Sequence, residues 1–107
     1  MGDPALDLSE IVELYKEDAR RTVHKMGEAH LRWDEVAQGG VALQDLRRFS
    51  HQLRGSGRTY GFRSVSRVAK AIESICIKME KKKWQADERT RQLMDAMIKR
   101  LAAAFAA

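Results

Sequence analysis

Residues 41–82, VALQDLRRFSHQLRGSGRTYGFRSVSRVAKAIESICIKMEKK, hold two apolar stripes of helical spacing on either side of Gly61. Apolar residues at intervals of three and four mark one face of an amphipathic helix. In the first part of the stretch this face carries Leu43, Leu46, Phe49, Leu53 and Tyr60. In the second part it carries Val65, Val68, Ala69, Ile72, Ile75, Cys76 and Met79. Because glycine commonly ends a helix, we predict helices over about 41–60 and 62–82 that fold back on each other at Gly61.

The same spacing continues outside this stretch in both directions. Before it, over about 9–37, the apolar face carries Ile11, Leu14, Tyr15, Thr22, Met26, Ala29, Trp33 and Val36. After it, over about 87–106, the apolar face carries Leu93, Met94, Met97, Ile98, Leu101 and Phe105. We expect all four stripes to form the core of the protein.

The breaks between the four helical segments are short. Gly39-Gly40 separates the first from the second, and Lys81-Lys82-Lys83 separates the third from the fourth. Asp7 followed by Glu10 resembles a capping box at the start of the first helix. No segment alternates with the period of two that marks a strand. We therefore predict an all-α fold, an antiparallel up-down four-helix bundle, as a single domain over residues 1–107.

The composition excludes several classes of protein. The 107 residues include 20 Lys and Arg against 15 Asp and Glu, for a net charge of +5, and one cysteine. A single thiol excludes an internal disulfide and a cysteine-based zinc site. No apolar run approaches the ~18 residues that span a bilayer, and no signal-peptide pattern is present, so we expect a cytoplasmic protein. We also expect a monomer, because the apolar stripes of a bundle of this size face inward. The positive charge by itself suits nucleic acid, anionic lipid or an acidic protein.

His51 lies in the middle of the second predicted helix, about 140° around the helical wheel from the centre of the apolar face. It therefore faces solvent, with Arg47, Arg54 and Arg58 as its helical neighbours. Residues 46–72 contain seven cationic side chains and no acid. Such surroundings favour the neutral imidazole, which is the nucleophilic form. The same cations would stabilise an attached phosphoryl group, and we assign this role to Arg54 and Arg58.

Three glycines follow His51 closely. Within a helix each glycine costs up to about 1 kcal/mol relative to alanine, so Gly55 and Gly57 need a reason. Gly55 lies on the exposed side, where a missing side chain lets the backbone of a partner come close. Gly57 faces the apolar stripe and would permit close helix packing. Gly61 is predicted to end the helix in the left-handed conformation, which is a structural role.

A turn at Gly61 would bring the third helix alongside His51 near residues 72 and 73. Glu73 is the acid at that level. A carboxylate that accepts the Nδ1 proton would fix the tautomer of the imidazole and leave Nε2 as the nucleophile. We predict that a partner protein binds the surface around this pair, which comprises Gly55, Arg47, Lys70, Ser66 and Ile77.

The stretch His51-Gln52-Leu53-Arg54-Gly55-Ser56-Gly57-Arg58-Thr59-Tyr60-Gly61-Phe62 resembles the signature of histidine phosphotransfer domains. In that family the His is followed by an apolar residue, a Lys or Arg and a Gly, and a second Gly closes the helix. The ending Thr59-Tyr60-Gly61-Phe62 is most similar to the N-terminal phosphotransfer domain of chemotaxis histidine kinases. There a Glu on the next helix hydrogen-bonds the His, and the ungapped match falls on Glu73. Arg54 stands where Lys is usual, and Lys70 stands where the chemotaxis domains often carry a second His.

The resemblance implies a phosphohistidine carrier in two-component signalling. His51 would accept a phosphoryl group from the ATP site of a histidine kinase and pass it to an aspartate of a response-regulator receiver domain. The domain itself would hold no cofactor and no metal, since the kinase binds ATP and the receiver binds magnesium. The residues agree with this, because the sequence contains no glycine-rich phosphate loop and no acid cluster for Mg²⁺. We expect those two protein partners, and neither nucleic acid nor a membrane.

Other interpretations stay open. The domain could be a free-standing phosphorelay shuttle, whereas the alanine-rich residues 101–107, which end without a capping signal, favour a module of a longer kinase. A basic nucleic-acid-binding helical module is a rival, although no aromatic residues interleave with the basic ones. A third possibility is an adaptor that docks receivers without being phosphorylated, against which His51 itself argues. We interpret the remaining aromatic and imidazole side chains as ordinary surface or packing residues, namely His24, His30, Trp33 and Trp84.

Overall fold

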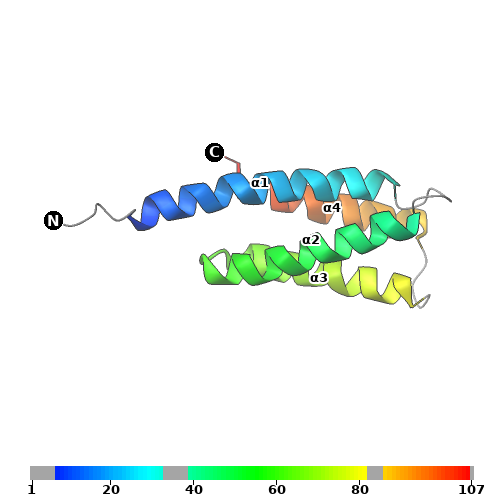
Figure 1. Cartoon of the computed structure of the whole chain (residues 1–107). Helices are drawn as coiled ribbons and strands as arrows, with labels where there is room; N and C mark the ends of the chain where they lie inside the picture. The colour runs from blue at the N-terminus through cyan, green and yellow to red at the C-terminus, as the bar shows by residue number, and fades with distance from the viewer. Residues whose placement is uncertain (1–6, 33–38, 82–85, 107) are drawn as a thin grey trace.

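The computed structural model describes residues 7–32, 39–81 and 86–106, and all regular structure in these ranges is helical. The helices are α1 (Leu8–Arg32), α2 (Gly39–Thr59), α3 (Arg63–Glu80) and α4 (Glu88–Ala104). They run alternately up and down, and each packs on two neighbours, so that α1 and α3 lie diagonally opposite (Figure 1). The predicted all-α, antiparallel four-helix bundle is confirmed.

One predicted break is wrong. Gly39 and Gly40 form the first turn of α2 instead of separating two helices. The first turn of a helix tolerates glycine, because its N–H groups lack intrahelical partners whatever the residue. The predicted end of the first helix, near residue 37, lies outside the described residues. The remaining ends differ from the predicted ones by one or two residues, and α4 ends at Ala104 with Phe105 as its C-cap. Trp33, Val36 and Trp84 lie outside the described residues.

The turn between α2 and α3 determines how the two helices pair. Gly61 has φ of 87°, in the left-handed region that glycine adopts without strain. The Phe62 N–H donates to the Gly57 carbonyl at 2.7 Å and the Gly61 N–H to the Arg58 carbonyl at 3.4 Å, which is the Schellman pattern. A Cβ on Gly57 would lie 3.2 Å from Val65 Cγ1 and 3.3 Å from the Phe62 carbonyl oxygen. Gly57 therefore lets α3 approach α2 closely, which sets the register of the pair.

Aspartate side chains cap the N-termini of the first and last helices, α1 and α4. The carboxylate of Asp7 accepts a hydrogen bond from the Glu10 N–H at 2.8 Å, and that of Asp87 accepts one from the Thr90 N–H at the same distance. Helix α3 begins differently, since its N-cap Phe62 provides no side-chain acceptor. The start of α3 thus depends on the turn that precedes it, whereas α1 and α4 depend on charged caps.

The core contains most of the predicted stripes. Its fully buried side chains include Met26, Leu46, Leu53, Ile72, Met94, Leu101 and Phe105. Three predictions are wrong, because Leu14 is 55% exposed, Leu93 43% and Tyr60 38%. Leu14 and Leu93 each lie 100° around the helix from a buried neighbour, Tyr15 or Met94, which places them at the edge of a narrow buried stripe. Tyr60 follows the last residue of α2. In the described ranges, no helix combines the length and the apolar character needed to cross a bilayer.

Aromatic side chains close the end of the bundle at the α2–α3 turn. The rings of Tyr15 and Tyr60 stack with centroids 4.3 Å apart, and Phe62 and Phe105 pack beside them. The hydroxyl oxygens of Tyr15 and Ser56 lie 3.0 Å apart, within hydrogen-bond distance. Because this cluster joins α1 and the end of α4 to the turn, it holds the α2–α3 pair rigidly against the other helices.

Candidate functional site

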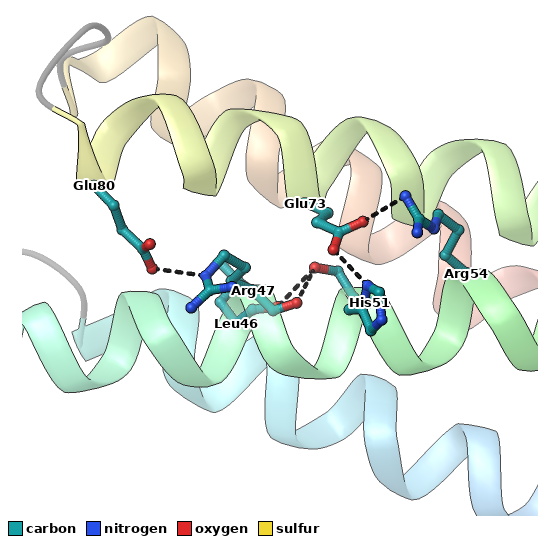
Figure 2. A network of polar contacts seen from close by, with 7 residues as sticks. Leu46, Arg47, His51, Arg54, Glu73 and Glu80 are labelled. Atoms are coloured by element: carbon teal, nitrogen blue, oxygen red, sulfur yellow. Dashed lines mark hydrogen bonds and ion pairs between the residues drawn. The ribbon is translucent and has the colours of Figure 1, made fainter.

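His51 projects from the exposed face of α2 toward α3. Its side chain is 62% exposed, and its Nδ1 lies 2.6 Å from Oε2 of Glu73 (Figure 2). An ionised carboxylate can only accept a hydrogen bond, so the imidazole donates from Nδ1. The neutral imidazole then carries its lone pair on Nε2, the atom that a partner could reach.

Glu73 differs from His51 in being almost enclosed. Only 7% of the residue is exposed, although it carries a carboxylate. Its second oxygen, Oε1, lies 2.9 Å from Nη1 of Arg54, so each oxygen has its own partner on α2 (Figure 2). Buried carboxylates are costly unless they are paired and hydrogen-bonded, and this one is both. Arg54 and His51 together therefore hold Glu73 in one orientation.

Two serines hold the backbone around this pair. Ser50 is fully buried beside His51, and its hydroxyl lies 2.8 Å from the Leu46 carbonyl oxygen and 2.9 Å from that of Arg47. The Ser66 hydroxyl crosses from α3 and donates to the Arg54 carbonyl at 2.8 Å. The second bond joins the two helices one turn beyond His51. It limits the sliding of α3 along α2 and so preserves the distance between His51 and Glu73.

Arg47 lies on the other side of His51 and is engaged elsewhere. Its Nε lies 3.0 Å from Oε1 of Glu80, near the end of α3 (Figure 2). Ile77 is half-buried between the levels of Glu73 and Glu80 on the same helix. The structure therefore places Arg47 and Ile77 on the side of His51 that faces the C-terminal end of α3. There the guanidinium of Arg47 is already paired with Glu80.

The opposite side of His51 opens into a hollow between α2 and α3. A Cβ added to Gly55 would meet nothing within 4 Å, so the space above this residue is open. The hollow is lined by Arg54, Gly55, Arg58, Ser66, Arg67 and Lys70. It contains no acidic side chain and four cationic ones. We refer to these six residues as the cationic hollow.

The structure thus divides the predicted site residues into two groups. It brings Arg54, Gly55, Arg58, Ser66 and Lys70 around one hollow, and it leaves Arg47 and Ile77 outside it. Arg67 belongs to the hollow and was not predicted. Its spacing of three from Lys70 was a signal for it, since residues three apart share a helix face. The ion pair between Arg54 and Glu73 was also missed.

The site combines the features that a nucleophilic imidazole needs. Nδ1 is held by a buried anion, which stabilises the positive charge that develops on the ring when Nε2 attacks an electrophile. The nearby Cys76 thiol is not activated, since burial raises its pKa to about 12. Within the described residues, no three metal-ligating side chains gather in one place.

The family model of the Hpt domain matches residues 10–104, which includes all but the outermost described residues. No curated protein and no solved structure matches the chain.

Proposed function

This chain belongs to the Hpt domain family, and on that premise we propose that His51 is its phosphorylated residue. Hpt domains have a phosphotransfer role in two-component signalling, where they interact with kinases and receiver domains. The observation that supports His51 is its pairing with Glu73: an exposed imidazole whose Nδ1 lies 2.6 Å from a buried carboxylate oxygen. The other described histidines, His24 and His30, lie on α1, away from this pair.

In the first step, the lone pair of Nε2 attacks the γ-phosphorus of ATP held by a histidine kinase. The bond from phosphorus to the bridging oxygen breaks, and ADP leaves with that electron pair. Nδ1 keeps its proton, and Glu73 stabilises the positive imidazole that results. In the second step, an aspartate oxygen of a receiver domain attacks the phosphorus. The P–N bond then breaks and its electron pair returns to Nε2.

Arg54 and Arg58 are proposed to stabilise the phosphoryl group. Arg54 uses Nη1 for Glu73, and its remaining guanidinium N–H groups are available to a phosphate oxygen. Arg58 lies one turn farther along α2 and lines the cationic hollow. ATP and magnesium belong to the partner domains in this proposal, so this domain supplies the nucleophile and positive charge.

The partner-binding surface is proposed to lie on both sides of His51. Gly55, Ser66 and Lys70 border the open hollow, and Arg47 and Ile77 border the other side. Gly55 has the clearest role, because the open space above it admits the backbone of a receiver. Gly61 is proposed to act only through the fold, by its left-handed turn.

We further propose that the domain serves as the N-terminal module of a chemotaxis-type kinase. The resemblance of Thr59-Tyr60-Gly61-Phe62 to that subgroup supports the proposal. A free-standing phosphorelay shuttle is the alternative. Labelling by the isolated catalytic domain of a chemotaxis kinase supports the first, and labelling only by kinases that carry receiver domains supports the second.

The decisive experiment tests where the label goes. The chain is incubated with a histidine kinase and ATP labelled in the γ-phosphate, and the label should be acid-labile and stable to alkali, as expected of phosphohistidine. His51→Gln should abolish it, and His24→Gln, a matched change on α1, should leave it intact. Label that persists in His51→Gln would overturn the assignment.

A further inference from the structure

The cationic hollow holds more positive charge than its surroundings neutralise. Arg54 is paired with Glu73, but Arg58, Arg67 and Lys70 have no ion pair within the described ranges. Several cations elsewhere in the described ranges have an acid within ion-pair distance. Examples are Lys16 with Glu13, Arg47 with Glu80, Arg48 with Asp45 and Lys99 with Asp95. Three like charges around one concavity make it a binding site for an anion.

The phosphoryl group on His51 does not account for all of this charge, because Arg54 and Arg58 are assigned to it and Arg67 and Lys70 on α3 are not. His51 does not line it; the hollow begins one helical turn farther along, at Arg54 and Gly55. An anion that binds to Arg67 and Lys70 would therefore accompany the phosphoryl group as a second negative group. An acidic side chain of the partner that approaches His51 is such an anion.

The hollow is also open to a protein partner. Gly55 forms part of its wall, and the space where a Cβ would lie is empty. The Ser66 hydroxyl is occupied by the Arg54 carbonyl, so the hollow presents guanidinium and ammonium groups as its donors. Arginine can bind a carboxylate through two parallel hydrogen bonds. An acidic side chain on a backbone that descends over Gly55 satisfies this geometry.

We propose that the cationic hollow anchors an acidic side chain of the receiver domain, and that Arg67 is a specificity-determining residue for that partner. This inference rests on the proposed function. The receiver is the partner with an acidic approaching face, because its acceptor is an aspartate and carboxylates hold its magnesium. A kinase also brings anions, the phosphates of its nucleotide, and the experiment below distinguishes the two partners.

The test separates docking from phosphoryl chemistry. The full chain is labelled at His51 by a histidine kinase with γ-labelled ATP and freed of the kinase. A panel of purified receiver domains is first compared, and the one that accepts the label fastest is chosen. The labelled chain is then mixed with increasing concentrations of that receiver domain. The rate of label loss gives a maximal rate and a half-saturating receiver concentration, measured for the wild type, Arg67→Glu and Arg21→Glu. Arg21 is an exposed residue of α1 outside the hollow, so its variant matches the change in net charge.

Arg67→Glu should raise the half-saturating concentration about ten-fold or more at low salt and leave the maximal rate close to that of the wild type, since a docking charge acts on encounter. The difference should shrink at high salt, and Arg21→Glu should behave like the wild type. Equal effects of the two variants, or a defect confined to the maximal rate, would overturn the proposal. A defect in labelling by the kinase with normal transfer would assign the hollow to the kinase instead. Absence of label at His51 in the wild type would overturn the proposed function itself.

Discussion

His51 and His24 are both exposed helical histidines beside a glutamate, yet their surroundings differ in every other respect. His51 on α2 meets Glu73 of another helix at 2.6 Å, and that carboxylate is buried and shared with Arg54. His24 on α1 meets Glu28 of its own helix at 4.0 Å, and both side chains are more than half exposed. The first pair is held by packing between two helices, whereas the second is a weak solvated contact. An imidazole becomes oriented when its partner is buried and fixed, and proximity along one helix is not sufficient.

The largest difference between the two histidines should appear when each neighbouring glutamate is neutralised in turn. Glu73→Gln keeps the shape of the side chain but removes the charge that stabilises the imidazole during attack. The rate of His51 labelling by a kinase should fall by about 10- to 100-fold, as for the loss of groups that orient a reactive histidine. Glu28→Gln, the matched change beside His24, should leave the rate unchanged. Equal rates in both variants would show that the buried pair does not activate His51.

A second test compares a glycine at the α2–α3 contact with one on α1. Gly57→Ala forces a Cβ against Val65 and the α3 backbone and should lower the free energy of unfolding by about 1–3 kcal/mol. Gly27→Ala places a Cβ in open space within a helix and should raise it by up to about 1 kcal/mol. Urea denaturation of both variants measures the difference. A stabilising Gly57→Ala would mean that the two helices are not held as closely as described.

The smallest expected effect is that of low pH on the helix starts, where α1 and α4 should respond and α3 should not. The pKa of the Asp7 carboxyl is lowered chiefly by the hydrogen bond from Ser9. The pKa of the Asp87 carboxyl is lowered chiefly by the hydrogen bonds from Thr90. A carboxyl whose folded pKa is lowered contributes stability that is present above its ordinary value of 3.8 and is lost as the pH falls through the folded pKa. The first turns of α1 and α4 should therefore exchange amide protons faster below that range, relative to intrinsic rates, whereas the start of α3 should not.

Amide exchange followed by NMR at pH 3 and pH 6 checks this, and Asp87→Asn provides the control. An asparagine caps a helix without titrating, so the α4 effect should disappear in that variant. Equal acid sensitivity of the α3 start would contradict the distinction between charged caps and the glycine turn.

Much of the fold could be predicted because helical spacing and short breaks leave few arrangements. Two of the errors in the predicted core lie where two adjacent apolar residues both fit the helical spacing but only one of them is buried. Leu14 and Leu93 fit the spacing within the tolerance of a helical wheel, but the bundle buries Tyr15 and Met94 instead. Gly39-Gly40 was misinterpreted as a break because glycine at a helix start and glycine between helices are indistinguishable by type alone.

The part of the candidate site that depends on the register of α3 against α2 could be predicted from the sequence. With Gly61 as the turn and no loop residues to spare, the position of Glu73 opposite His51 followed from counting along two helices. The bond between Arg54 and Glu73 did not follow from counting. It depends on which way two long side chains turn in the space between the helices, and a wheel contains no such information.

The sequence by itself therefore determined the helices, the turn that pairs two of them, and the exposure of His51. These are consequences of a 3.6-residue period and of the conformational freedom of Gly61, and both are local properties of the chain. Only the tertiary structure decided that Glu73 would be buried with a separate partner on each oxygen, and that Arg67 would join Arg58 and Lys70 around one hollow. Burial and convergence depend on the distance and rotation between two helices, which packing at Gly57 and Val65 sets.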